Sequence, residues 1–580
     1  MPWTQPIDPF DNIALSALVA SVPVVFIFVA LYRRMKGHLA SLLTVSLAIV
    51  LAVLAYGMPV RLAVLSGFHG ALYGLLPICW IIISAVYLFN LTVAGGQFEI
   101  IKNFMASVTP DRRLQALLIA FSFGAFLEGA AGFGAPVAIS AAMLVGLGFN
   151  PLYAAGICLI ANTAPVAFGS VGTPIIMAAR ISEIPDMAIS QMVGRTLPVL
   201  SVIVPFYLVV LMSGWKKSME VLPAVLVSGI SFAFFQWLTA NYLGPMLPDV
   251  LAGIASIICL MILLKFWKPS SVWRFSEEPQ QTIASKLKYS TGEVVRACSP
   301  FIIMTMIIVA WGLDPVKAAL NAIGHFKFDI PGMQNAILKP DGSPLEIKPF
   351  DVNYLSAPGS AVLLAALISI PLIGMSYRQG LKIFWSTLGQ LKFSVITIIS
   401  VVGFAFVANN SGMSLTMAMA LASTGVLFPF FSPVLGWLGV FLTGSDTSSN
   451  ALFSKLQASS AEAIGVDPVV TVAANASGGV TGKMISPQSI AIGAAAVGLA
   501  GQESSLFRFT VRHSFYMLLV ICVLTMTQAY AVPWIIPSYQ KGLSATSLAS
   551  VSTGLWYLVL LAGAIGGVVA AVLMLNRKKP

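Results

Sequence analysis

Apolar runs of roughly twenty residues recur along this chain of 580 residues, and the short segments between them hold most of its charges. The runs 12–32, 247–265 and 554–575 are examples. A helix of about 20 apolar residues is long enough to cross the hydrocarbon core of a bilayer. Only 9% of the residues are charged, whereas about a quarter of a soluble domain is charged. The chain is therefore expected to be an all-α polytopic membrane protein.

Thirteen transmembrane helices are predicted from these runs. Their approximate bounds are 12–32, 39–57, 72–94, 154–179, 195–215, 219–243, 247–267, 294–313, 352–375, 393–409, 470–498, 513–537 and 553–575. Basic residues collect in the cytoplasmic loops of membrane proteins, and the first basic residue here is Arg33. The N-terminus is therefore expected outside and the basic C-terminus in the cytoplasm. Arg61, Arg180 and Arg195 fall outside, against this trend, but the basic residues inside outnumber them.

Two apolar segments are not expected to cross the membrane from one side to the other. The alternation of basic loops holds only if 114–149 and 431–464 each enter and leave the membrane on one side. These segments are therefore predicted to be re-entrant hairpins. Backbone of this kind is tolerated at membrane depth where it is buried in protein or lines a cavity.

The two hairpins belong to an internal repeat. The first half carries FLEG at 126–129, AN at 161–162 and TP at 173–174, and the second carries FLTG at 441–444, AN at 474–475 and SP at 486–487. The matches keep their order, and span 72–94 is expected to run inward whereas its counterpart 393–409 runs outward. The halves are therefore predicted to be inverted repeats. Inverted repeats with interrupted helices are a recurring plan of secondary transporters, with the substrate near the midplane.

Four regions follow from this repeat. They are 1–215, the first repeat, with hairpin 114–149 and broken helix 154–179; 216–293, linking transmembrane helices and a cytoplasmic loop; 294–537, the second repeat, with hairpin 431–464 and broken helix 470–498; and 538–580, a C-terminal transmembrane helix with a basic cytoplasmic tail. Segment 314–351 is the one sizeable loop expected outside.

Glu128 is the only charged residue between positions 114 and 179. A carboxylate inside an apolar span is costly and by default marks a functional site. Gly129, Gly132 and Gly134 follow it, and glycines open the backbone of a helix. Glu128 is therefore a candidate for proton coupling. The alternative is that it pairs with a cation and only closes the fold.

The second hairpin holds a run of short polar side chains, TGSDTSSN at 443–450, between apolar flanks. Hydroxyl groups beside the free N–H groups of a helix end suit an anion, so Ser445 and Thr447 are candidate substrate-binding residues. Asp446 is the acidic group of this hairpin and a second candidate for proton coupling. Gly444 is expected to shape the backbone there. The alternative is an ordinary polar loop tip.

The two broken helices complete the predicted site. Each holds an amide, glycines and a proline within one span: Asn162, Thr163 and Pro174 in the first, Asn475 and Pro487 in the second. The prolines mark helix breaks. The amides and the threonine hydroxyl are candidates for binding substrate near the midplane.

Lys483 is the only basic residue between Lys455 and Arg508. An intramembrane cation of this kind needs a partner. Two roles are open to it. It pairs with a substrate carboxylate, or it neutralises Asp446 or Glu128.

Four segments closely resemble bacterial L-lactate permeases, and the resemblance extends over nearly the whole chain. They are FGAFLEGAAGFGAPVAI at 123–139, ANTAPVAFG at 161–169, VFLTGSDTSSNALF at 440–453 and GKMISPQSIAI at 482–492. The resemblance implies proton-coupled uptake of lactate, with D-lactate and glycolate as co-substrates, across the bacterial inner membrane. In that membrane the N-terminus, expected outside from the charge pattern, is periplasmic. The resemblance also implies kinship with the ion-transporter superfamily, whose members move a domain of hairpins and broken helices against a scaffold in an elevator motion.

Other function classes fit the sequence less well. A membrane enzyme needs a nucleophile–base pair or a metal cluster, and the five scattered cysteines and four histidines form neither, so no metal and no cofactor is expected. The net charge of +11 lies in short loops and does not indicate nucleic acid. A sodium-coupled carrier of the same fold and an anion channel stay open. The expected partners are lactate or glycolate, protons and membrane lipid; the sequence does not decide whether the chain forms a homodimer.

Overall fold

The computed structural model of the chain describes residues 2–33, 35–132, 134–275, 289–347, 349–499 and 502–539. The predicted span 553–575 and the basic tail lie outside these residues. The described chain is mostly helical, as predicted. Its short strands form two sheets: β1 (Trp3–Thr4) pairs with β3 (Ile337–Leu338), and β2 (Phe326–Phe328) pairs with β4 (Phe350–Val352).

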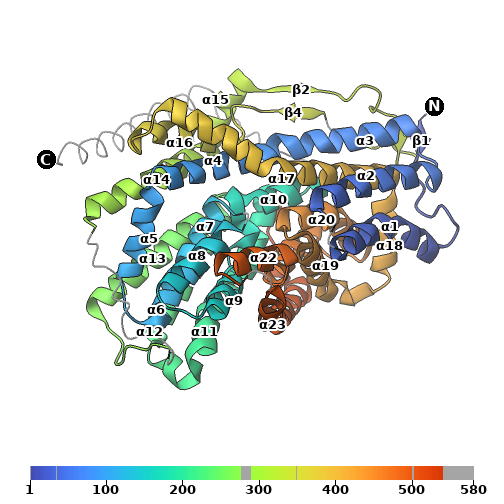
Figure 1. Cartoon of the computed structure of the whole chain (residues 1–580). Coiled ribbons are helices and arrows are strands. Elements are labelled where there is room, and N and C mark those ends of the chain that lie inside the picture. The colour runs from blue at the N-terminus through green and yellow to red at the C-terminus, as the bar shows by residue number, and fades with distance from the viewer. Residues whose placement is uncertain are drawn as a thin grey trace.

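One group of helices gathers around the long helix α17 (Tyr377–Ser411). Its other members are α1 (Ile13–Tyr32), α2 (Gly37–Leu54), α3 (Val60–Tyr73), the π-helix Gly74–Cys79, α4 (Trp80–Ala94), α5 (Gln97–Ser107), α14 (Thr291–Gly312), α15 (Asp314–Gly324) and α16 (Pro358–Leu372). Within this group, α17 packs against α2, α3 and α4. Figure 1 shows α3, α16 and α17 along one edge of the molecule.

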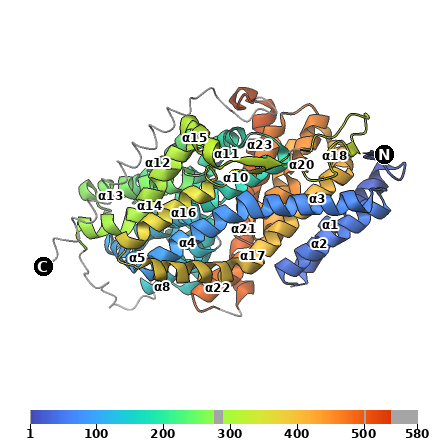
Figure 2. The same cartoon turned by 90° about the horizontal axis from the view of Figure 1, so that it is seen from above.

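The second group holds both predicted hairpins and both predicted broken helices. Its members are α6 (Arg112–Gln115), the π-helix Ala116–Phe123, α7 (Gly124–Ala130), α8 (Ala135–Gly146), α9 (Pro151–Ala161), the 3-10 helix Val166–Phe168, α10 (Gly169–Ser182), α11 (Asp186–Met219), α12 (Leu222–Tyr242), α13 (Pro248–Phe266), α18 (Met413–Ala422), the 3-10 helix Gly425–Leu427, α19 (Phe428–Thr443), α20 (Asp446–Ala463), α21 (Pro468–Lys483), α22 (Pro487–Ala496), α23 (Glu503–Tyr530) and the 3-10 helix Pro533–Ile535. In Figures 1 and 2, α10 and α20 lie next to the first group, and α23 lies on the far side.

The count of membrane spans differs somewhat from the predicted thirteen. Eleven helices in the described residues are long and apolar enough to cross a membrane, or twelve if Pro151–Ala161 and Val166–Ser182, bent by 67°, form one span. The first arms of the predicted hairpins, Arg112–Ala130 and Gly425–Thr443, are among them. In contrast, predicted span 352–375 contains the 15-residue α16, and predicted span 470–498 divides into α21 and α22. Prolines at the start of α16 and α22 fix where these shorter helices begin.

Both predicted hairpins are helix–turn–helix units. The two ends of the first hairpin lie close together: the guanidinium of Arg112, near its start, is 5.8 Å from the centre of the Phe149 ring, near its end. In the second, α19 and α20 run antiparallel: the Gln457 amide donates to the Ser432 carbonyl oxygen at 2.8 Å, and the Ser449 hydroxyl donates to that of Gly436 at 3.1 Å. Their re-entrant path through a membrane stays a prediction, as do the inverted repeats.

Loops that the charge pattern assigns to one side lie together in the structure. Arg113 donates to the carbonyl oxygens of Lys217 and Ser271, at 2.6 and 2.8 Å. Hydrogen bonds from Lys217, Ser271 and Arg113 lower the pKa of Glu220 to about 2. At another edge, β1 near the N-terminus pairs with β3 in segment 314–351. These contacts agree with the predicted grouping of the loops; which group faces the cytoplasm stays a prediction.

Glycines let α21 approach α19 so closely that side chains do not fit between them. A Cβ atom at Gly478 would lie 2.1 Å from the carbonyl oxygen of Pro433, and one at Gly482 would lie 2.3 Å from that of Trp437. On the facing helix, a Cβ at Gly436 would lie 1.9 Å from the carbonyl oxygen of Asn475. Small residues at such spacing let membrane helices pack backbone to backbone. This contact fixes α21, and with it Lys483, against the second hairpin.

Gly478→Val is therefore expected to separate α19 from α21. The valine would meet backbone atoms, which cannot rotate away, so the cost should reach about 3 kcal/mol or more. Thermal unfolding of the detergent-purified protein checks this expectation. Gly389→Val in α17 is the matched control, because that helical glycine is exposed and a Cβ there meets nothing within 4 Å. Equal unfolding temperatures for the two variants would contradict the account of this contact.

Candidate functional site

A buried ion pair joins the first hairpin to the second broken helix. Lys483, the last residue of α21, donates to Glu128 of α7 at 2.7 Å. Glu128 is 2% exposed and Lys483 is 9% exposed. The structure thus brings together two residues that the sequence singled out separately. It shows the lysine paired with Glu128, one of the two roles left open for it.

The Glu128 carboxylate is only partly satisfied by this pair. Its other oxygen, Oε2, is buried and has no hydrogen-bond partner among the described residues. The backbone of α10 passes close beneath it, since a Cβ at Gly169 would lie 2.6 Å from Oε1. Gly169 therefore makes room for the carboxylate. One oxygen of Glu128 thus engages Lys483, while the other is left unpaired in the part of the chain that the structure describes.

Asp446 lies in the first turn of α20, where the second hairpin turns. It is 3% exposed, and neither carboxylate oxygen has a hydrogen-bond partner among the described residues. A Cβ at Gly479 would lie 2.2 Å from the Asp446 Oδ1. The Asp446 carboxyl group therefore packs against α21, one helical turn before Lys483. It is within electrostatic range of both Lys483 and Glu128. Both predicted proton-coupling residues thus lie around one lysine.

The structure adds a third carboxylate that sequence reasoning missed. Asp249 lies in the first turn of α13, is 1% exposed and packs against the first hairpin, since a Cβ at Gly129 would lie 2.8 Å from its own Cβ. It is within electrostatic range of Glu128 and Lys483. A signal was present in the sequence, because Asp249 is the only charged residue between Glu220 and Lys265.

These four residues form what we call the acidic cluster: Glu128, Asp249, Asp446 and Lys483. The one ammonium group among them pairs with Glu128 and is within electrostatic range of Asp249 and Asp446. Removing a charge from water costs several kcal/mol unless a partner compensates it. A fully ionised acidic cluster would leave two negative charges without a counterion.

The first broken helix presents an unused amide. Asn162 ends α9, is 5% exposed, and neither its Oδ1 nor its Nδ2 has a hydrogen-bond partner among the described residues. The neighbouring Thr163 hydroxyl donates to the Ile160 carbonyl oxygen at 2.7 Å and lies 3.6 Å from the Met517 sulfur. Asn162 is thus free to bind a ligand, whereas Thr163 is already engaged.

The start of α10 is strained. Ser170, Val171 and Gly172 have φ angles of 47°, 58° and 72°, and such a left-handed conformation costs a non-glycine residue about 1–3 kcal/mol. The Ser170 hydroxyl donates to the Ala131 carbonyl oxygen in the turn of the first hairpin at 3.0 Å. A Cβ at Gly172 would lie 2.3 Å from the Pro245 carbonyl oxygen. These contacts hold the strained turn against the hairpin beside Glu128.

The second broken helix differs from the first. Asn475 lies inside α21, and the break comes later, after Lys483. Its amide donates to the Asn450 side chain at 2.8 Å and accepts from Gln457 at 3.1 Å. Asn450 in turn donates to the carbonyl oxygen of Pro174 at 3.3 Å. Asn475 therefore takes part in a buried chain of hydrogen bonds that connects the two broken helices through α20.

The remaining predicted residues lie in the turns. Gly132 and Gly134 have φ angles of 60° and 83°, and Gly444 has one of 71°, a region that glycine adopts without cost. Ser445 caps α20 by accepting from the Ser448 amide at 3.3 Å, and Thr447 is buried in the first turn of that helix. Pro487 starts α22, so it begins a helix and does not only end one. The hairpin turn thus offers hydroxyls next to a helix N-terminus, as predicted.

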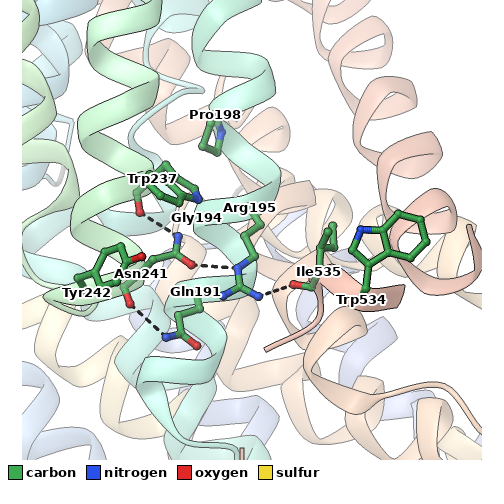
Figure 3. Close-up of a pocket in the computed structure, with 9 residues that line it drawn as sticks. All are labelled: Gln191, Gly194, Arg195, Pro198, Trp237, Asn241, Tyr242, Trp534 and Ile535. Carbon is green, nitrogen blue, oxygen red and sulfur yellow. Dashed lines mark hydrogen bonds between the residues drawn. The ribbon is translucent and has the colours of Figure 1, made fainter. Parts of the chain in front are cut away.

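A separate cavity of about 490 Å³ opens beside α11 and α12. Figure 3 shows Arg195 at its centre, between Asn241 and Ile535. The guanidinium donates to the Asn241 side chain at 2.9 Å and to the carbonyl oxygen of Ile535. Trp237 and Trp534 contribute aromatic walls. The cavity shares no lining residue with the acidic cluster, and the sequence assigned no role to Arg195.

Comparison with known proteins bears on this arrangement. A family model described as L-lactate permease matches residues 16–532. An L-lactate permease of Bacillus subtilis is 53% identical over 564 residues, which are 93% of this chain and 100% of that protein. The glycolate permease GlcA of Escherichia coli is 51% identical over 551 residues, which are 91% of this chain and 98% of that protein.

Among solved structures, MtrF of Neisseria gonorrhoeae matches with a TM-score of 0.43 and 13% identity, covering 79% of this chain and 82% of that one. That likeness is too small to bear on mechanism. The match to permeases over almost the full length, together with eleven helices able to cross a membrane, identifies a multi-pass membrane protein. It also confirms the resemblance carried by the four sequence segments. The chain belongs to the L-lactate permease family.

Proposed function

We propose that this protein is a secondary active transporter that takes up L-lactate together with protons across the bacterial inner membrane. D-lactate and glycolate are proposed as related substrates, because relatives covering nearly the whole chain are named for L-lactate and for glycolate. The observation that supports proton coupling is the acidic cluster, in which a single buried lysine pairs with Glu128 and the carboxylate oxygens of Asp249 and Asp446 have no hydrogen-bond partner among the described residues. The N-terminus is proposed to be periplasmic and the C-terminus cytoplasmic.

Substrate and proton are proposed to bind interdependently through the pair of Lys483 and Glu128. While Glu128 is ionised, the lysine is occupied. When a proton binds to a Glu128 oxygen, the ammonium group loses its partner and becomes available for the carboxylate of lactate. A charge-assisted hydrogen bond of this kind is the strongest single contact that the site can offer to a monocarboxylate. On the cytoplasmic side the proton leaves, Glu128 recovers Lys483, and lactate is released.

Neutral groups are proposed to recognise the rest of the substrate. The 2-hydroxyl group needs a hydrogen-bonding partner that is free in the empty site. Asn162 meets this requirement best, because neither its Oδ1 nor its Nδ2 has a partner in the described part of the chain. Ser445, Thr447 and Thr163 remain candidates from the hairpin and the helix break. Asn475 is a weaker candidate, since its amide is already bound on both sides.

The movement is proposed to be of the elevator type. Two hairpins and two broken helices lie in one helix group, and the group around α17 would act as the scaffold. The inverted repeat predicted from the sequence is in keeping with this division, because such repeats provide two related conformations about a central site.

Asn162→Ala is expected to weaken lactate binding without unfolding the protein. Loss of one neutral hydrogen bond costs about 0.5–1.5 kcal/mol, which is roughly two- to twelve-fold in affinity. Competition of unlabelled lactate against labelled lactate measures the change. Propionate, which lacks the hydroxyl group, should lose less affinity than lactate. An unchanged lactate affinity would place the hydroxyl-binding group elsewhere.

Uptake of labelled L-lactate into sodium-free proteoliposomes tests the proposed function. An inward proton gradient of about one pH unit should drive roughly tenfold accumulation if one proton accompanies each lactate, because one unit corresponds to about 1.4 kcal/mol. Accumulation only with a sodium gradient would identify a sodium-coupled carrier. Equilibration without counterflow, the acceleration of labelled efflux by external unlabelled lactate, would identify an anion channel.

A further inference from the structure

The surroundings of Asp249 do not supply the hydrogen bonds that an ionised carboxylate needs. Asp249 is 1% exposed, and neither oxygen has a hydrogen-bond partner among the described residues. The amide side chain beside it, Gln236, is shared with other groups: it donates to the Ala164 carbonyl oxygen at 3.0 Å and accepts from Ser201 at 2.7 Å. A buried polar group without partners is costly, and an ionised one is far more so.

The charged groups that face Asp249 are few. From α7 the facing group is Glu128, and from α21 it is Lys483. Helix α12 and the π-helix Ala116–Phe123, which pack against α13, carry no Asp, Glu, Lys, Arg or His. Lys483 is bound to Glu128 at 2.7 Å, so Glu128 largely compensates its positive charge. The attraction between Lys483 and Asp249 is weakened accordingly.

Opposing forces therefore act on this carboxyl group. Burial and the nearby negative charge of Glu128 favour its neutral, protonated form. The N-terminal turn of α13 and the positive charge of Lys483 favour its ionised form. A change in the charge of Glu128 or Lys483 shifts this balance. Asp249 can thus exchange a proton in response to events at the ion pair.

We propose that Asp249 is a third proton-binding residue of the transport site, a role that rests on the proton coupling proposed above. When the lactate carboxylate arrives beside Lys483, it adds a negative charge to a site already rich in carboxylates. An O–H bond formed between a proton from the outer solution and an Asp249 oxygen cancels that charge. The same bond breaks on the cytoplasmic side, and the proton returns to water.

The contact with Gly129 explains how this proton is linked to the hairpin. A Cβ at Gly129 would lie 2.8 Å from the Asp249 Cβ and 2.9 Å from the Val250 amide nitrogen. The residue next to Glu128 in the chain therefore packs directly on the first turn of α13. A displacement of the hairpin would change the distance between the two carboxyl groups, and with it the stability of the proton on Asp249.

Asp249→Asn tests the inference, since asparagine keeps the shape of the aspartate side chain but cannot bind or release the proton. In proteoliposomes, we expect the variant to retain lactate counterflow. Its accumulation under an inward gradient of about one pH unit should be roughly tenfold lower than that of the unaltered protein, because one proton fewer accompanies each lactate. Asp186→Asn is the matched control, because Asp186 also lies in the first turn of its helix but is exposed; it should accumulate lactate like the unaltered protein.

The outcomes separate this inference from the proposed function. If the unaltered protein fails to accumulate lactate with protons, the proposed function is wrong and the role of Asp249 falls with it. If the unaltered protein accumulates lactate and Asp249→Asn does so equally, only the role of Asp249 is wrong. A parallel loss of counterflow and accumulation in a folded variant would indicate a structural role and would also overturn the inference.

Asp249→Glu covers the case in which the asparagine variant does not fold. It keeps an ionisable group but moves it by one methylene group, so the balance of forces on the proton changes. We expect lactate uptake to remain and its pH profile to shift relative to that of the unaltered protein. An identical pH profile would overturn the proposal.

Discussion

Glu128→Gln is expected to abolish proton-driven accumulation of lactate while leaving a folded protein in the membrane. Glutamine keeps the length and one acceptor oxygen of Glu128, so a contact with Lys483 at about the observed distance of 2.7 Å remains possible. It cannot gain or lose a proton, and the lysine is no longer held by a charge. Accumulation should therefore fall from roughly tenfold, per pH unit of gradient, to equality with the external concentration.

Glu99→Gln provides the control for this prediction. Glu99 also pairs with a lysine, Lys102, at 2.6 Å, but its side chain is 60% exposed, and an exposed pair contributes little. This variant should accumulate lactate normally. Normal accumulation by Glu128→Gln as well would show that the coupling proton binds elsewhere, and Asp446→Asn would then be the next variant to measure.

Lys483→Met is expected to have the largest effect on stability. It removes the only cation from the acidic cluster and leaves Glu128 buried without a partner. Breaking a buried pair from one side costs about 3–5 kcal/mol. The double variant Glu128→Gln/Lys483→Met should recover most of this loss, because Glu128, the direct partner of Lys483, no longer carries an unpaired charge, yet it should not take up lactate. Thermal unfolding and lactate uptake of the single and double variants measure the two effects.

Lys455→Met is the matched control for Lys483→Met. Lys455 pairs with Glu183 at 3.1 Å, but both side chains are partly exposed, so its loss should cost less than about 1 kcal/mol. A double variant no more stable than Lys483→Met would contradict the view that an unpaired charge causes the loss. Lactate uptake by that double variant would exclude Lys483 as the carboxylate-binding group.

Much of the site could be predicted because charged residues in apolar spans stand out. Glu128, Asp446 and Lys483 were singled out in this way, and the structure places them around one another. Their pairing could not be predicted, since Lys483 and Glu128 are 355 residues apart and the sequence offered Asp446 as an equal partner. Asp249 carried the same signal, but the apolar run that contains it was interpreted only as a membrane span.

The backbone was harder to predict than the helices. The strained turn at Ser170 and Val171 had no signal, because neither residue type favours positive φ and only the surrounding contacts hold it. The break in the second broken helix, in contrast, lies between Lys483 and Pro487, the proline that marks it in the sequence. Tertiary contact decides the strained turn, whereas a local signal was sufficient for this break.

Lactate-driven proton movement in sodium-free proteoliposomes tests the central claim most directly. Lactate is added outside, without any initial gradient, and the external pH is followed. Coupled uptake predicts alkalinisation of the medium that exceeds the leak of protein-free liposomes and is lost in Glu128→Gln. Lactate uptake by the unaltered protein with no alkalinisation above that leak would contradict proton symport through the acidic cluster.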